Sequence, residues 1–395
     1  MPVSLKSEQV DLLDCIRLAL LIKEGRLASS HLLSLAGLAG GFRKMFELSD
    51  KTILETVSGP PERIQRLSAL LRSGLLRERA LQIGEQCRRQ KISAVACSDN
   101  RYPVNLRQIS GFPIVLFSRG REIQSVMAEK TTATIVGTRR PTGYGRLVGR
   151  RFSEQLAQAG VLIISGMARG IDTIAHESAL AAGMQTLAVL ACGLDIVYPP
   201  DNAALLDRIC EHGTIISEHL PGTPPIRTYF PARNRILSGL ADAVIVIEAS
   251  LKSGSMITAS FAADQGRDVF AVPGNVLSRE SEGCNRLIAE GAFMLTEVAD
   301  VLWRLPAARR LDSFTAYLAE AERDDLNNVE EESGSLKTNL VVEEITQLLR
   351  GCALTSAELA NLMSAPLPEI LCNLSELEIQ GKVTRDRGKF ILKRI

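Results

Sequence analysis

Residues 161–176 read VLIISGMARGIDTIAH, and this stretch decides the fold. It begins with an apolar run, Val161–Ile164, and continues into a short segment bracketed by Gly166 and Gly170. Beyond Gly170 the apolar residues recur at helical spacing. The pattern predicts a buried strand, a glycine-containing loop and a helix, with Arg169 just before the helix. Because a helix N-terminus has free N–H groups and a partial positive charge, the loop is a candidate anion site.

Six apolar runs of this kind follow one another along the chain. They read ATIVG, VLIIS, TLAVLA, TIIS, AVIVIE and DVFAVP, and they begin at residues 133, 161, 186, 214, 243 and 268. Runs that are apolar throughout are typical of strands buried on both faces of a parallel sheet. Helical patterns at 145–159 and 170–183 separate the first three runs, as in βα repeats. The sequence therefore predicts an α/β fold with a doubly wound, mostly parallel, Rossmann-like sheet.

The other parts of the chain have different patterns. Residues 1–90 carry leucines at helical spacing, which predicts a helical N-terminal domain. We expect the α/β domain to occupy residues 91–305. Residues 320–332 contain seven Asp or Glu and one Arg, and this acidic, apolar-poor composition predicts a linker over residues 306–337.

Residues 338–395 are typical of a small separate domain. Thr355 and Glu358 have the T-x-x-E spacing of a capping box at the start of a helix. A second helix is expected at 370–379, followed by two short strands around Asp386-Arg387-Gly388. Two helices and a hairpin predict a winged helix. Its second helix has three Glu in or beside it and no Lys or Arg, which is unfavourable for entering a DNA groove.

The overall composition excludes several classes of protein. The net charge of the 395 residues is +1, so a nucleic acid or membrane surface would have to be bound by a local cluster of charge. The eight cysteines form no CxxC pair and there are only four histidines, so we expect reduced thiols and no metal site or cofactor. No transmembrane or export segment is visible in the sequence. We therefore expect a cytoplasmic location.

In a doubly wound sheet, ligands bind at the carboxyl ends of the strands. Glycine-containing turns follow these ends, including GTRRPTGYG (137–145), SGMARGID (165–172) and EASLKSGSMITA (248–259), while TYFPARNR (228–235) lies in a connection. Glycine lets backbone N–H groups approach a ligand closely. The basic side chains predicted at this edge are Arg139, Arg140, Arg169, Arg233, Arg235 and Lys252. The acids near them are Asp172, Asp195, Glu218 and Glu248, which could orient these arginines.

The usual catalytic and cofactor motifs are absent from this edge. The first turn, GTRRPTGYG, does not have the GxGxxG pattern of a dinucleotide-binding loop, and no P-loop motif occurs. The second strand ends in Ser165-Gly166, where an NAD site would have an Asp or Glu that binds the ribose. Ser165 and His176 do not form a nucleophile–base pair with a third group, so we interpret His176 as structural. The edge is predicted to hold phosphates without cleaving them. Aromatic residues in or beside the turns either stack on bases or fill the core: Tyr144, Tyr198, Tyr229 and Phe230.

From about residue 101 to residue 303 the sequence resembles the DNA-processing protein A family (DprA, also called Smf). The matching motifs are VGTRRPTGYG, SGMARGIDTIAH, CGLDIVYPPDN, SEHLPGTPP, FPARNRILSGL, EASLKSGSMITA, VFAVPGN and GCNRLIAEGA. The resemblance implies a bacterial cytosolic protein that is not an enzyme and that binds and protects single-stranded DNA. It implies that the protein loads the RecA recombinase during natural transformation. It also implies a homodimer formed through the Rossmann-like domain.

The resemblance also implies which residues bind the strand. Its motifs place Gly137 and Arg139 in the first turn, Arg169 in ARGID, and Phe230, Arg233 and Arg235 in FPARNR. Lys252 and Ser253–Ser255 lie in LKSGS, with Gly254 between the two serines. Four neighbours complete the predicted DNA-binding set: Arg140, Gly166, Gly170 and Asn234. For Arg169, an ion pair with Asp172 or Glu248 is the alternative.

Two other functions remain as alternatives. Phosphoribohydrolase-like enzymes bind phosphate at glycine turns of a similar sheet, but they carry a PGGxGT turn with catalytic Glu and Arg, whereas here PGN (273–275) stands alone. A regulator of double-stranded DNA would use the winged helix, and the acidic second helix counts against it.

Overall fold

The computed structural model describes residues 8–57, 60–72, 74–128 and 130–305, together with separate stretches between 345 and 392. The chain divides into two compact units, Met1–Tyr317 and Leu318–Ile395, each with hydrophobic core of its own. The predicted linker, residues 306–337, lies outside the described residues.

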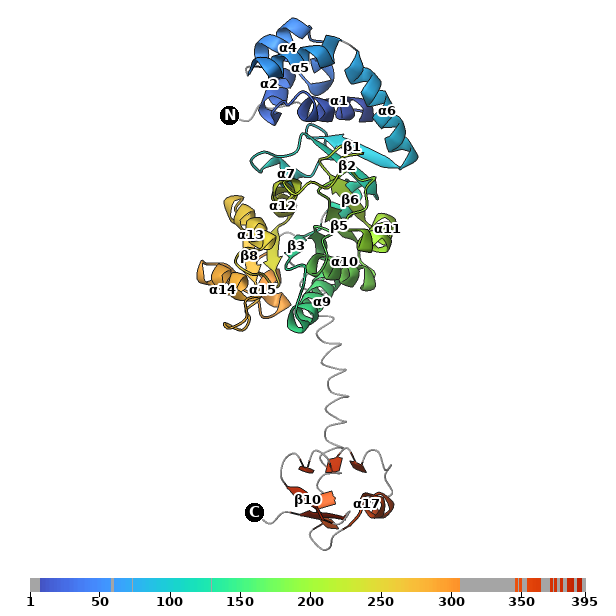
Figure 1. Ribbon diagram of the computed structural model, residues 1–395, viewed down its shortest axis with the longest axis vertical. Coiled ribbons are helices and arrows are strands. Elements are labelled where there is room, and N and C mark those ends of the chain that lie inside the picture. The colour runs from blue at the N-terminus through green and yellow to red at the C-terminus, as the bar shows by residue number, and fades with distance from the viewer. Residues whose placement is uncertain are drawn as a thin grey trace. The chain divides into compact units, whose positions relative to one another are not determined.

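A nine-stranded sheet forms the centre of the first unit, in the order β1-β2-β6-β5-β4-β3-β7-β8-β9 (Figure 1). Neighbouring strands are parallel from β6 to β9, whereas β2 is antiparallel to both β1 and β6. The six predicted apolar runs form β3 to β8, which confirms the predicted doubly wound, mostly parallel sheet. The strands are β1 (Ile92–Ala96), β2 (Val115–Gly120), β3 (Thr132–Val136), β4 (Leu162–Ser165), β5 (Thr186–Val189), β6 (Thr214–Ser217), β7 (Ala243–Val246), β8 (Asp268–Ala271) and β9 (Phe293–Met294).

Three strands of this sheet, β1, β2 and β9, were not predicted. In β1 the buried Ile92 is followed by the exposed Ser93, so the strand is not apolar throughout. β9 has only two residues, Phe293 and Met294, and its backbone pairing with β8 alone defines it. Short edge strands carry little hydrophobic signal, because only part of their surface is buried.

Six helices precede β1 and lie beside β1 and β2, at one end of the sheet (Figure 1). The prediction of a helical segment over residues 1–90 is confirmed for the described residues. Helix α1 shows how these helices are fixed: the Asp11 carboxylate accepts a hydrogen bond from the Asp14 N–H at 2.8 Å, and Ile16, Leu18 and Leu20 are fully buried. The helices are α1 (Leu12–Lys23), α2 (Ser29–Ala39), α3 (Phe42–Met45), α4 (Asp50–Thr56), α5 (Pro61–Arg72) and α6 (Leu75–Arg89).

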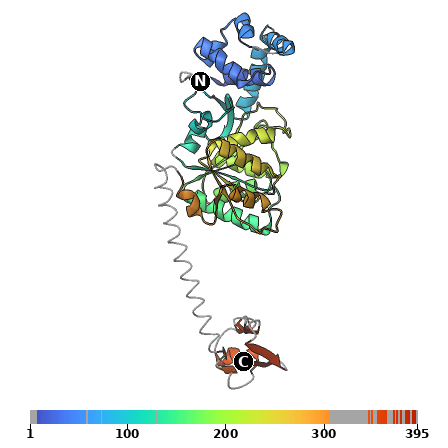
Figure 2. The ribbon, with the colours of Figure 1, turned by 90° about the vertical axis from the view of Figure 1, so that its left-hand side faces the viewer.

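The later helices cover both faces of the sheet (Figure 2). The apolar side chains of α9, α10 and α15 share one core with one face, and those of α12 and α13 share another core with the opposite face. Both faces are therefore buried, as the uninterrupted apolar strands predicted. The helices are α7 (Val104–Arg107), α8 (Ile123–Met127), α9 (Gly143–Gln158), α10 (Ile171–Ala181), α11 (Ala203–His212), α12 (Tyr229–Leu240), α13 (Gly254–Asp264), α14 (Glu282–Ala289) and α15 (Val298–Leu302), with a 3-10 turn, η1 (Pro200–Asn202).

The strand order reverses direction at β3. The chain runs from β3 outward through β4 and β5 to β6, then crosses back through α12 to β7 on the other side of β3. Loops that follow the carboxyl ends of β3 and its neighbours β4 and β7 therefore diverge, and the crevice between them is where this class of sheet binds ligands.

The second unit contains a helix, α17 (Ser356–Leu362), and two antiparallel strands, β10 (Val383–Asp386) and β11 (Lys389–Leu392). The predicted capping box is confirmed, since the Thr355 N–H donates to the Glu358 carboxylate at 2.7 Å and the Glu358 N–H donates to the Thr355 hydroxyl at 3.2 Å. The hairpin is also as predicted. The second helix falls only partly within the described residues, so the winged helix stays a prediction.

Candidate nucleic-acid interface

Two adjoining cavities lie at the carboxyl edge of the parallel strands. The larger has a volume of about 780 Å³ and is lined by the loops after β3, β4, β5, β6 and β7 and by α12 and α13. The smaller has a volume of about 310 Å³ and is lined by the loops after β3, β4 and β5. Arg139, Ala168, Tyr198 and Phe230 line both cavities and therefore stand between them.

Most of the predicted DNA-binding residues lie at these cavities. The larger cavity is lined by eight of them: Gly137, Arg139, Phe230, Arg233, Asn234, Ser253, Gly254 and Ser255. The smaller is lined by five: Arg139, Arg140, Gly166, Arg169 and Phe230. Gly170, Arg235 and Lys252 line neither cavity. The cavities thus bring together predicted residues from the loops after β3, β4 and β7 and from α12.

The boundary between the cavities combines a cation with two aromatic rings. The Arg139 guanidinium lies over the Phe230 ring, 5.6 Å from its centroid, and the Tyr198 ring is tilted against Phe230 at 5.5 Å. Arg139 is exposed, Phe230 is half-buried and Tyr198 is partly exposed. Phe230 therefore does not fill the core, and rings with accessible faces and a neighbouring cation are suited to stacking unpaired bases.

Arg233 is buried and holds the loops at the edge in place. Its guanidinium donates to the carbonyl of Gly166 at 2.8 Å and to the carbonyl of Val189, so α12 is tied to the ends of β4 and β5. Burial lowers the pKa of Arg233 to about 10, although the Asp172 carboxylate opposes this shift. Burial likewise raises the pKa of Asp172 to about 6, and Arg233 opposes that shift. Both buried groups line the larger cavity, and the charge of each favours the charged form of the other.

The loop after β4 needs glycine at two positions. A Cβ on Gly166 would lie 2.6 Å from a guanidinium nitrogen of Arg233, and Gly170 has a φ of +84° with the Arg139 backbone 2.7 Å from its Cβ position. Between them Met167 also has a positive φ, 61°, which residues other than glycine rarely adopt. Strained backbone of this kind persists where the surrounding structure fixes it, and it is frequent at binding sites.

Arg169 is exposed and has a partner that was not predicted. Its Nε lies 2.6 Å from the Asp201 carboxylate, and both side chains are more than half exposed, 60% and 62%. The Asp172 carboxylate instead accepts a hydrogen bond from the Ala168 N–H at 3.2 Å, within the loop that enters α10. The alternative of an ion pair with Asp172 or Glu248 is therefore wrong, and the first turn of α10 already contains the carboxylate of Asp172.

The N-terminus of α13 faces the larger cavity. Ser253 caps this helix by accepting a hydrogen bond from the Ser255 N–H at 3.2 Å, and the first turn contains no acid. Gly254 is exposed and a Cβ there would meet nothing within 4 Å, so its backbone is accessible from the cavity. The partial positive charge of the helix N-terminus therefore adds to that of the arginines.

Two predicted cations are placed away from the cavities. Arg235 is two residues beyond Arg233 on α12, and it forms an ion pair with Glu218 at 2.6 Å. Two residues on a helix span about 200°, so both side chains cannot face the same cavity. Lys252 is exposed beside the α13 loop. Two of the four predicted orienting acids act on these arginines: Asp172 opposes the lowering of the Arg233 pKa, and Glu218 pairs with Arg235. The other two do not, since Asp195 accepts a hydrogen bond from the Gly222 N–H and Glu248 accepts one from the Thr142 hydroxyl.

The structure adds Arg227 to the larger cavity, and this residue was not predicted. It is exposed and precedes the TYFPARNR motif by one residue. The proline-rich stretch around it, GTPPIR, gave no periodic signal, although a cation beside the aromatic pair Tyr229-Phe230 could have indicated it. The cavities together are lined by five arginines, Arg139, Arg140, Arg169, Arg227 and Arg233, and by one acid, the buried Asp172.

Ser165 and His176 are each hydrogen-bonded within the core. The Ser165 hydroxyl is fully buried and donates to the Ile135 carbonyl at 2.7 Å, and His176 is fully buried beside the Thr186 hydroxyl at 2.7 Å. Burial lowers the pKa of His176 to about 3, which agrees with its structural interpretation. In the part of the chain that the structure describes, no group of His, Cys, Asp or Glu side chains is arranged to bind a metal ion, and no helix is long and apolar enough to span a membrane.

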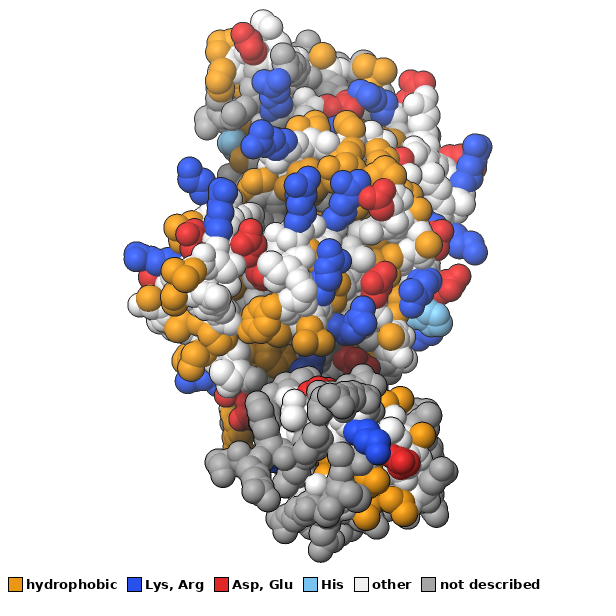
Figure 3. All heavy atoms as spheres, turned by 60° about the horizontal axis from the view of Figure 1, so that its bottom comes forward, with side chains coloured by type: hydrophobic (Ala, Val, Ile, Leu, Met, Phe, Trp, Pro, Cys, Tyr) orange, Lys and Arg blue, Asp and Glu red, His pale blue; other side chains and the backbone are white. Residues whose placement is uncertain are grey.

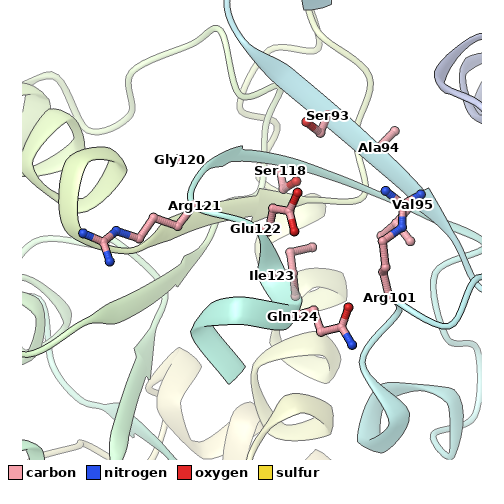
Figure 4. A pocket seen from close by; sticks show the side chains of 10 residues that line it. All are labelled: Ser93, Ala94, Val95, Arg101, Ser118, Gly120, Arg121, Glu122, Ile123 and Gln124. Carbon is pink, nitrogen blue, oxygen red and sulfur yellow. The ribbon is translucent and has the colours of Figure 1, made fainter. Parts of the chain in front are cut away.

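A third cavity lies among β1, β2 and α8 (Figure 4). Its volume is only about 80 Å³, and it is lined by Ser118, Glu122 and Arg101 among others. Arg121 points away from the other labelled side chains. This cavity is too small for a nucleotide and is lined by none of the predicted site residues.

Charge on the surface is mixed. Figure 3 shows one face of the molecule on which Lys and Arg side chains are interspersed with Asp and Glu. This agrees with the net charge of +1.

Comparison with known proteins gives consistent results. The family model for DNA recombination-mediator protein A matches residues 93–306. Protein Smf of Escherichia coli (strain K12) is 35% identical over 73% of this chain and 74% of its own length. DNA processing protein DprA of Bacillus subtilis (strain 168) is 39% identical over 55% of this chain and 73% of its own length. The X-ray structure of DNA processing protein A from Streptococcus pneumoniae covers 76% of this chain and 99% of that chain, with 33% identity and a TM-score of 0.63. Because the family model matches more than half of the sequence, the chain belongs to the DNA recombination-mediator protein A family.

Proposed function

We propose that the carboxyl edge of the sheet binds single-stranded DNA. The observation that carries this proposal is the boundary between the two cavities, where Arg139, Tyr198 and Phe230 combine a cation with accessible aromatic rings. Phosphates would contact the exposed arginines and the N-terminus of α13, while an unpaired base stacks on the rings. A base in a duplex is stacked and paired and cannot enter such a cavity without being flipped out.

The wider role proposed for the protein is that of a recombination mediator in the cytoplasm. In this role the protein covers incoming single strands, protects them and delivers them to the RecA recombinase. A homodimer would offer the carboxyl edges of two sheets to one strand. The names of the family and of its DNA-processing relatives support this role.

The enzymatic alternative has less support. In the PGN turn, the Gly274 N–H donates to the Asn285 side chain at 3.1 Å, and none of the three residues lines either cavity. The cavities contain no acid apart from Asp172, which is buried against Arg233. We therefore propose that the strand is bound and left intact.

The proposal is tested by titrating the purified protein with oligo-dT, with a duplex and with a mononucleotide, each at two salt concentrations. We expect oligo-dT to bind most tightly, with an affinity that falls as salt rises, and to remain uncut when Mg²⁺ is present. Equal or tighter binding of the duplex would favour the winged helix as the DNA-binding part. Tight mononucleotide binding or reproducible strand cleavage would favour the enzyme.

Arg169 and Asp201 give a paired prediction. Arg169→Ala should weaken binding of oligo-dT and make the slope of log K against log salt shallower by about 0.7, the contribution of one phosphate contact on a single strand. Asp201→Asn should tighten binding, because it releases Arg169 from its ion pair. Neither change should alter the melting temperature much, since an exposed ion pair contributes about 0–1 kcal/mol. An unchanged salt slope in Arg169→Ala would show that this arginine contacts no phosphate.

A further inference from the structure

The segment from Arg139 to Arg151 contains five arginines and no Asp or Glu. The first two, Arg139 and Arg140, line the cavities. The other three, Arg146, Arg150 and Arg151, lie on α9 and are all exposed; we refer to them as the α9 stripe. None of the three belongs to the predicted DNA-binding set.

The stripe lies on the outer side of an amphipathic helix. The inner side of α9 buries Gly145, Gly149, Phe152 and Leu156 against the sheet and α10. Arg146 and Arg150 are four residues apart and therefore neighbours on the helix surface, where two like charges repel each other. Such an arrangement destabilises the free helix slightly, and a bound anion would remove this cost.

The stripe arginines lack the acidic partners that several arginines on other helices have. Arg79, Arg88 and Arg286 each form an ion pair with a glutamate. Within the described part of the chain, none of the three stripe arginines forms an ion pair, and the one acid of α9, Glu154, pairs with none of them. Their charges are therefore available to a ligand.

The position of α9 connects the stripe to the cavities. The helix begins at Gly143, four residues after Arg139, and runs from the carboxyl end of β3 back toward the start of β4. The four residues from Arg146 to Arg150 rise about 6 Å along the helix axis, which is comparable with the separation of neighbouring phosphates in an extended strand. The stripe thus continues the row of cations that begins at Arg139 and Arg140.

We propose that the α9 stripe binds backbone phosphates of the DNA strand outside the cavities. These phosphates belong to the part of the strand that extends out of the smaller cavity near Arg140. The proposal rests on the proposed function and extends it from a site for one or two nucleotides to a track along a helix. Contacts of this kind position a strand without reading its sequence. They matter only for a strand long enough to reach beyond the cavities.

The test compares two double variants of the full-length protein. Arg146→Gln with Arg150→Gln removes two stripe charges, and Arg77→Gln with Arg208→Gln removes two exposed charges from α6 and α11 as a matched control. Affinities are measured for oligo-dT of about 5 and about 16 nucleotides, within the range of site sizes of single-strand binders. Melting temperatures check that both variants are folded.

We expect the stripe variant to bind the longer oligonucleotide about tenfold more weakly, with a salt slope shallower by about 1.4, while its affinity for the shorter one is unchanged. The control variant should keep both affinities within about twofold, since Arg77 and Arg208 line neither cavity and salt screens exposed charges that do not contact the strand. If the stripe variant keeps its affinity for the longer strand, or loses affinity equally for both lengths, the stripe does not bind the strand outside the cavities. The proposed function would still stand. Wild-type protein that binds neither oligonucleotide would overturn both.

Discussion

Replacing Arg233 by alanine lowers the free energy of unfolding by about 2–6 kcal/mol, because it leaves two buried carbonyls without their donor and each unsatisfied buried group costs about 1–3 kcal/mol. The guanidinium is almost fully buried and donates to the carbonyls of Gly166 and Val189. Without it, both carbonyls lose a donor, and the buried Asp172 carboxylate loses the positive charge that most favours its ionised form. The ends of β4 and β5 would no longer be tied to α12.

Urea unfolding at several pH values measures this loss. Arg233 opposes the burial that raises the pKa of Asp172, so removing Arg233 raises that pKa further above about 6. A carboxyl group whose pKa is raised in the folded state favours folding when it is protonated, and this contribution is lost as the pH rises. The destabilisation should therefore be larger at pH 8 than at pH 5. Arg208→Ala, an exposed arginine on α11, should change stability by no more than about 0.5 kcal/mol. An Arg233→Ala protein as stable as the control would contradict the structural role.

Arg139→Glu weakens the binding of oligo-dT by about a hundredfold, equivalent to about 2.7 kcal/mol. Arg139 lines both cavities and lies over the Phe230 ring, so the substitution places a carboxylate at the point where strand and protein would be closest. The change replaces attraction to phosphate by repulsion, which costs more than deletion of the charge. Arg139 is exposed, so the fold should be unaffected.

Arg208→Glu is the matched control, because it reverses one exposed charge that lines neither cavity. It should change the affinity by less than about threefold, since salt screens exposed charges that do not contact the strand. A loss below threefold for a folded Arg139→Glu protein would show that the boundary between the cavities does not bind the strand.

The strands and the edge could be predicted from the sequence because their signals are local. Uninterrupted apolar runs indicated β3 to β8, and glycine-rich turns at their carboxyl ends indicated the crevice. The different roles of Arg233 and Arg235 could not be predicted. Both occur in FPARNR, and only the packing of α12 on the sheet decides that Arg233 is buried and that Arg235 pairs with Glu218.

Other features depended on contacts between distant parts of the chain. The Arg169–Asp201 pair joins residues separated by 32 positions, and no spacing rule predicts it. Arg227 reaches the larger cavity only because the connection between β6 and α12 folds back over the edge. The edge strands β1 and β9 are held by backbone pairing, which leaves little trace in the hydrophobic pattern.

In the proposed complex, a single strand of DNA occupies the two cavities that meet at Arg139, Tyr198 and Phe230. Ultraviolet cross-linking of oligo-dT to the full-length protein, followed by mass spectrometry of the peptides, tests this claim most directly. The account predicts adducts at Tyr198 or Phe230, because their rings would stack on the bases. Adducts found only in residues 1–90 or 338–395 would contradict it.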